Sequence, residues 1–140
     1  MLYPMFISVS PEAFARIAES ADRVAEAVDL MEDAPASTFS LGLEWFGVQA
    51  AVGDTAMAAV QGAQVWAEDP PVGGASPEEV TRIVDDLAAV DRESAEDVGA
   101  EFMDEVGLEP STSIIEALDS LQEFYQGAAY RGEAVIVVFN

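Results

Sequence analysis

The chain has 140 residues, 51% of them hydrophobic, and its 27 Asp and Glu residues against five Arg give a net charge of -22. This length and composition predict one globular domain over residues 1–140 and exclude a disordered protein or a membrane-spanning helix. The charge opposes binding to nucleic acid and to anionic membranes, because both gain affinity from Lys and Arg.

The first half of the chain predicts a strand, a long helix and several shorter elements. Residues 2–9 are expected to form the strand, and Ser10-Pro11-Glu12 is a typical helix start with a capping serine and an N-terminal proline. Apolar residues at spacings of three and four continue from Phe14 to Met31, which predicts one helix with one buried face. The shorter elements are a loop over 33–37, a helix near 40–52 and short strands on either side of Gly62 within 55–67.

Two helices are predicted between residues 76 and 106. The first begins at the cap residue Ser76 and presents apolar residues at helical spacing to the core. The second covers 93–106 and stops at Gly107, because glycine readily adopts the left-handed conformation that ends a helix. Its inward-facing residues are expected to be Val98, Phe102 and Val106.

The chain is expected to end in a helix and a buried strand. Ser113 and Glu116 match the capping-box pattern S-x-x-E, and the helix behind them should end near Gly132. Residues 134–139 (AVIVVF) form a continuous β-branched and aromatic run, which is typical of a strand buried on both faces. The expected fold class is α+β: a small sheet including the N- and C-terminal strands, packed against four to five helices.

The glycine pair in PPVGGASPEEV (residues 70–80) raises the question of phosphate binding. A phosphate loop needs free backbone N–H groups and usually a nearby Lys or Arg, and neither G-x-x-x-x-G-K-[ST] nor G-x-G-x-x-G occurs in the chain. Pro77 removes one N–H donor, and Ser76 would accept from another. Glu78 and Glu79 place negative charge where the phosphate would bind. We therefore interpret the glycines as a flexible approach to a capped helix.

The sequence contains no His and no Cys. Their absence excludes Ser-His-Asp and Cys-His catalysis, thiol redox chemistry, and zinc bound by thiolate or imidazole. We predict no cofactor, no metal site and no catalytic residue. Acids at four-residue spacing line one face of the helix over 93–106, which we interpret as solvated surface: Glu93, Asp97, Glu101 and Glu105.

Six residues are candidates for a binding site. Trp66 precedes a loop-forming stretch, and an exposed tryptophan is a strong contact anchor. The alternative is that Trp66 packs under the 70–75 loop, since tryptophan is highly buried on average. The other candidates are acids that flank loops or helix ends: Glu44, Glu68, Asp69, Asp85 and Asp86.

Four segments together resemble the YfbM-like family of small bacterial proteins, a family of unknown function. They are VSPEAF (9–14), the helix with Trp45, SPEEV (76–80) and FYQGAAYRGEAVIVVF (124–139), so the resemblance covers nearly the whole chain. Family members often carry a His where this chain has Gln49, and an Arg and an aromatic residue where it has Gly73 and Gly74. The resemblance implies the α+β fold and implies no reaction.

Three functions are compatible with these features. The first is a non-catalytic interaction domain, sequestering or immunity-like, that binds a basic protein by electrostatic complementarity. The second is an enzyme that uses carboxylates or a divalent cation in a concave pocket. The third is a housekeeping domain whose acidity reflects adaptation to salt, and whose stability would rise with salt. We rank the interaction domain first and, because the N-terminus lacks the pattern of a signal peptide, expect a cytoplasmic location.

Overall fold

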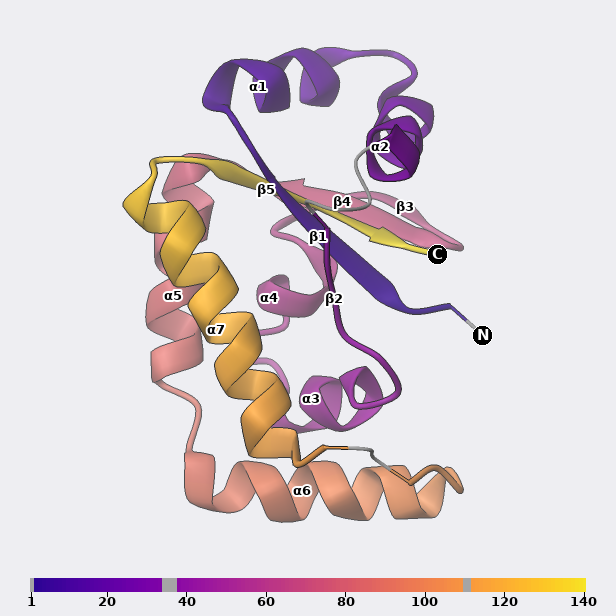
Figure 1. Cartoon of the computed structure of the whole chain (residues 1–140), viewed down its shortest axis with the longest axis vertical. Coiled ribbons are helices and arrows are strands. Elements are labelled where there is room, and N and C mark those ends of the chain that lie inside the picture. Colours follow the sequence, from indigo (N-terminus) through magenta and orange to yellow (C-terminus); the bar gives the residue numbers. More distant parts are fainter. Residues whose placement is uncertain (1, 34–37, 110–111) are drawn as a thin grey trace.

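The computed structural model describes residues 2–33, 38–109 and 112–140. Five strands form one sheet in the middle of the molecule, and helices cover both of its faces (Figure 1). In chain order the elements are β1 (Pro4–Val9), α1 (Pro11–Glu19), α2 (Arg23–Asp33), β2 (Phe39–Ser40), α3 (Trp45–Val52), α4 (Ala58–Gln61), β3 (Gln64–Glu68), β4 (Pro71–Ala75), α5 (Pro77–Ala88), α6 (Arg92–Glu105), α7 (Ile114–Tyr130) and β5 (Ala134–Phe139). The predicted α+β fold class is confirmed.

The strand order is β2-β1-β5-β4-β3, and every neighbouring pair is antiparallel. β5 lies in the centre and pairs with β1 from Pro4 opposite Phe139 to Val9 opposite Ala134. All six residues of β5 are buried, because the strand has a neighbour at each edge and helices over each face. The prediction of a doubly buried C-terminal strand, in one sheet with the N-terminal strand, is therefore confirmed.

Two apolar clusters, one on each face of the sheet, form the core. Successive residues of a strand point to opposite faces, so β5 contributes to both clusters. Val135, Val137 and Phe139 enter one cluster, and Ile136 and Val138 enter the other. Helices α1 and α2 cover the face with Ile136, while α3 to α7 lie on the other side of the sheet (Figure 1).

The prediction of one helix from Phe14 to Met31 is wrong, because the segment forms two helices. α1 ends at Glu19, and Ser20 leaves the helical conformation with φ -72° and ψ 143°. The Ser20 hydroxyl accepts a hydrogen bond from the N–H of Asp22 at 3.1 Å, a local bond that competes with the helical backbone bond. With the short α4, this break brings the helices of the described residues to seven, above the expected four to five.

The region around Gly62 agrees with its prediction only in part. The strand after Gly62 is present as β3, but the residues before it form α4. Residues 71–75, expected to be flexible, form β4 within the sheet. Gly73 and Gly74 are buried there, and a Cβ added at Gly74 would lie 2.7 Å from the ring of Phe14. The glycines allow neighbouring groups to pack directly on the backbone of β4.

Helix α6 presents a different face to the core than the sequence predicts. Its buried residues are Ala95, Gly99 and Met103. Val98 and Val106, which were expected to face inward, are 45% and 47% exposed. Two small residues, Ala95 and Gly99, let α3 approach this face closely, and Met103 is the one large side chain that α6 buries fully.

Serine caps begin three helices as predicted. Ser10, Ser76 and Ser113 each accept a hydrogen bond from the backbone N–H three residues further on. The Glu79 carboxylate also accepts from the N–H of Ser76 at 2.9 Å, which completes a capping box. Gly107, with a φ of 76°, follows α6 as the predicted stop.

We expect Ser76→Ala to lower the free energy of unfolding by about 0.5–2 kcal/mol. The variant leaves the N–H of Glu79 without its side-chain acceptor and removes one half of the capping box. Urea unfolding measures the loss. The control is Ser120→Ala, because Ser120 is exposed within α7 and its loss should change stability by less than about 0.5 kcal/mol. Equal stability of Ser76→Ala and the wild type would contradict the cap.

Candidate functional site

Helix α6 lies across one end of the molecule, with α3 and α7 on its inner side (Figure 1). The contact with α3 depends on two glycines. A Cβ added at Gly99 would lie 2.8 Å from the carbonyl oxygen of Gly47, closer than side chains tolerate. Backbone packing therefore holds α6 in place and fixes the direction in which its exposed side chains point.

The exposed side of α6 is acidic. Of the six acids in this helix, five are exposed: Glu93, Asp97, Glu101, Asp104 and Glu105. Glu109, which follows the helix, and Glu116, in the first turn of α7, are exposed as well. We call these seven exposed carboxylates the acidic end. The prediction of a solvated acidic face on this helix is confirmed.

Arg92, the one arginine of α6, forms an ion pair and hydrogen bonds within the chain. Arg92 Nε forms an ion pair with Asp119 Oδ1 at 3.2 Å. Its Nη1 donates to the carbonyl oxygens of Leu87 and Val90 at 3.1 and 3.2 Å, and its Nη2 donates to Gln122 Oε1. These bonds join the α5–α6 connection to α7, so Arg92 contributes to the structure and does not pair with the acidic end.

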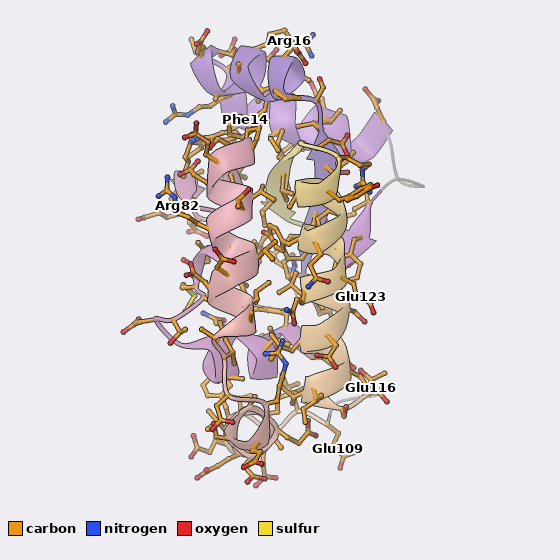
Figure 2. All side chains as sticks on the ribbon, turned by 90° about the vertical axis from the view of Figure 1, so that its left-hand side faces the viewer. Phe14, Arg16, Arg82, Glu109, Glu116 and Glu123 are labelled. Atoms are coloured by element: carbon orange, nitrogen blue, oxygen red, sulfur yellow. The ribbon has the colours of Figure 1, made fainter. Side chains whose placement is uncertain are left out.

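The other four arginines lie away from the acidic end. Figure 2 shows Arg16 and Arg82 toward the opposite end of the molecule from Glu109. The remaining two are Arg23, at the start of α2, and Arg131, directly after α7. α2 lies on the other face of the sheet, and the 17 residues of α7 separate Arg131 from Glu116 by about 20 Å. These four arginines thus lie apart from the acidic end. Negative charge is not confined to that end, because six exposed acids lie on or between α1 and α2: Glu12, Glu19, Asp22, Asp29, Glu32 and Asp33.

Two further acids near this end are used inside the structure. Glu44 directly precedes α3, is 7% exposed, and accepts a hydrogen bond from the N–H of Thr112 at 3.3 Å. Glu96 accepts from the N–H of Ile115 at 2.9 Å. Both N–H groups lie at the start of α7, where the helix dipole favours a carboxylate. Glu44, a predicted site residue, therefore connects the start of α3 to the start of α7.

Trp66 lies on β3 and is neither an exposed anchor nor a residue packed under a loop. The side chain is half-buried, and the expected 70–75 loop is strand β4. Its ring contacts that of Phe14, with centroids 5.8 Å apart, and the guanidinium carbon of Arg23 lies 5.9 Å from the ring centroid. An open cavity of about 620 Å³ adjoins the ring at the α1–α2 junction.

The remaining candidates are distributed over other elements. Glu68 ends β3 and lines a cavity of about 240 Å³, and Asp69 follows it in the turn to β4. Asp85 is exposed and Asp86 is half-buried, both on α5. The structure brings Trp66, Glu68 and Asp69 together along one strand and its turn, but it places the other three candidates on α5 and before α3.

A third cavity, of about 250 Å³ between α1 and α2, was not predicted from the sequence. It is lined by Arg16, Ile17, Glu26, Asp29, Leu30 and Asp33. Its three acids are spaced by three and four residues along α2 and so share one face, a signal that the sequence contains. Within the described residues, no three acids are grouped closely enough to hold a metal ion.

A polar network fixes the N-terminus of α5 to β3. Gln64 donates to Glu79 Oε1 at 2.8 Å and accepts from Trp66 Nε1 at 3.3 Å. Burial by itself would raise the pKa of Glu79. The hydrogen bonds from Ser76 and Gln64, with the charge of Arg82, outweigh burial and hold that pKa below its ordinary value of 4.5. This carboxylate occupies the helix N-terminus at which a phosphate would have to bind.

We expect Glu79→Gln to lower the free energy of unfolding at neutral pH. In acid, the free energies of unfolding of the variant and the wild type should differ less. The pKa of Glu79 is lowered by folding, so its carboxylate stabilises the fold above pH 4.5 and loses this effect as the pH falls through the folded value. Urea unfolding at neutral pH and below pH 4.5 checks the prediction. Glu78→Gln, at the exposed neighbour, is the control. A destabilisation that is independent of pH would contradict the role of the charge.

The described residues thus define a small α+β protein in which an acidic helix lies across one end. The chain belongs to the family described as a domain of unknown function, DUF1877, whose family model matches residues 2–138, and the resemblance expected from the sequence is confirmed. Its fold is similar to the crystal structure of YfbM, a protein of unknown function from Escherichia coli. The TM-score is 0.75 and the sequence identity 15%, over 99% of each chain, so the likeness shows the fold alone.

A search of curated proteins found no match to the chain. Within the described residues, every helix is too short or too polar to cross a membrane.

Proposed function

We propose that this protein is a non-catalytic interaction domain that binds a basic protein through its acidic end, as a sequestering or immunity-like protein does. The observation that carries the proposal is the group of exposed carboxylates at one end, from which four of the five arginines lie apart. Seven exposed carboxylates gather at this end, and the arginine of α6, Arg92, is bonded within the chain. Such a surface attracts a cationic partner, speeds association and disfavours partners of the wrong charge.

An enzyme that uses carboxylates or a divalent cation is less well supported. It needs several acids that converge on one concave site. The acids singled out from the sequence are divided among three places, and Glu44, the most buried of them, is tied to the start of α7. Within the described residues, the three acids of the α1–α2 cavity are not grouped closely enough to hold a metal ion. We expect no binding to nucleic acid or to anionic membranes, because the charge that favours a basic partner opposes both. The cytoplasmic location stays a prediction.

A pull-down from a lysate of the source organism at physiological ionic strength tests this function. An unrelated protein of equal negative charge is the control bait. One stoichiometric partner on this protein and none on the control would support the proposal. The same basic proteins on both baits would contradict it and favour acidity that only adapts the surface to salt.

Charge-reversed baits then show whether the acidic end is responsible. Glu101→Lys with Glu105→Lys should release the partner, because both residues belong to the acidic end. Asp85→Lys with Glu123→Lys changes the same amount of charge at exposed positions on α5 and α7 and should retain it. Equal loss from both double variants would mean that net charge, and not this surface, determines binding.

A further inference from the structure

An apolar stripe crosses the acidic end. Val98, Phe102 and Val106 are four residues apart and so align along α6 and its C-terminal cap. Val98 and Val106 are 45% and 47% exposed, and Phe102 is half-buried. Glu101 and Glu105 are exposed and alternate with these residues in the sequence. We call Val98, Phe102 and Val106 the apolar stripe. At 3.6 residues per turn, it lies between the buried face of α6 and the side that carries Glu101 and Glu105.

The apolar stripe differs from the other exposed apolar side chains of the described chain. Those occur singly on separate elements: Leu2 before β1, Val65 on β3 and Tyr130 at the end of α7. Isolated apolar residues are normal on a protein surface and need no partner. Apolar residues that repeat at helical spacing are typical of a contact face, and here the inner side of the helix is already filled by Ala95, Gly99 and Met103.

We propose that the apolar stripe is a docking surface for a basic amphipathic helix of the partner protein, an inference that rests on the proposed function. From Val98 to Val106 the chain rises about 12 Å, close to two turns of a partner helix laid along it. Over that distance a helix presents apolar residues at i, i+3 or i+4, and i+7. Lys or Arg residues beside them would reach Glu101 and Glu105.

A second copy of this chain fits the apolar stripe poorly. Two copies docked through it would bring Glu101 and Glu105 of each chain together, with a charge of -22 on both. Like charges across an interface disfavour the complex. Charges more than about 8 Å away are largely screened at physiological ionic strength, so the carboxylates beside the stripe select the partner more strongly than the net charge does. They favour a basic helix.

An NMR titration of the isotope-labelled protein with two synthetic peptides tests this surface. Both peptides contain the same Leu and Lys residues over about four helical turns. One has the order of an amphipathic helix, and the other is reordered so that no apolar face forms. We expect the amphipathic peptide to bind about tenfold more tightly and to shift amide signals centred on residues 94–108. Equal affinities, or shifts centred elsewhere, would overturn the proposal.

Matched variants identify the side chains responsible. The double variant Val98→Ser with Val106→Ser should bind both peptides equally, and its spectrum in the absence of peptide checks that it is folded. Val65→Ser removes an equally exposed valine from β3 and should keep the tenfold preference. A double variant that still prefers the amphipathic peptide would show that the apolar stripe is not the docking surface.

The same double variant distinguishes this inference from the proposed function. Used as a pull-down bait beside the wild type, it should lose the specific partner. A partner held equally by both baits would refute the docking surface and leave the proposed function standing. No specific partner on the wild type would refute the proposed function, and the peptide titration would still decide whether the apolar stripe binds a basic helix.

Discussion

Replacing Gly73 by Ala is expected to destabilise the protein by about 3 kcal/mol or more, although the change adds a single methyl group. A Cβ at this position would lie 2.2 Å from the carbonyl oxygen of Gln64 and 2.8 Å from that of Gln61. Both are backbone atoms, one in β3 and one at the end of α4, so no side-chain rotation relieves the clash. The α4–β3 connection would have to move away from β4.

Gly127→Ala is the matched control. Gly127 lies within α7, and a Cβ there would meet only the flexible end of the Arg131 side chain, at 3.2 Å. Because Ala favours a helix over Gly by about 1 kcal/mol, this variant should be neutral or stabilising. Urea unfolding of both variants provides the comparison. If Gly73→Ala proved as stable as Gly127→Ala, the close packing of the α4–β3 connection on β4 would be wrong.

The glycine pair shows why part of the fold could not be predicted from the sequence. The stretch PPVGGA has neither alternation nor a β-branched run, and therefore lacks the local signal of a strand. Gly73 and Gly74 are required by what packs on them, including the ring of Phe14, which is 60 residues away in the sequence. β5 could be predicted, because its six apolar residues themselves indicate burial on both faces.

The candidate site, like the fold, could be predicted from the sequence only in part. The carboxylates of α6 could be predicted, because charged side chains at regular spacing are seldom buried. The apolar stripe could not, because size and spacing assign Val98 and Val106 to the core. The structure buries Ala95 and Gly99 there, and that choice depends on Gly47 in α3, a contact that no local pattern of α6 reveals.

Gly99→Val is expected to destabilise the protein by about 3 kcal/mol, the upper end of the usual cost of overpacking. The first added carbon alone would lie 2.8 Å from the carbonyl oxygen of Gly47 and 2.7 Å from Ile114 Cγ2. Ile114 is fully buried and β-branched, so its side chain has little freedom to rotate away. The two methyl groups of valine would separate α6 from α3, and the exposed face of α6 would turn with it.

Ala100→Val is the control, since Ala100 is exposed on the same helix and the variant loses only about 0.7 kcal/mol or less of helix propensity. Urea unfolding measures both stabilities. The peptide titration adds a functional measurement: Gly99→Val should weaken the preference for the amphipathic peptide, and Ala100→Val should keep it. Equal stabilities and equal preferences would mean that the backbone contact between α3 and α6 does not set the direction of the acidic end. A loss confined to Gly99→Val would show that two glycines 52 residues apart orient the surface on which binding depends.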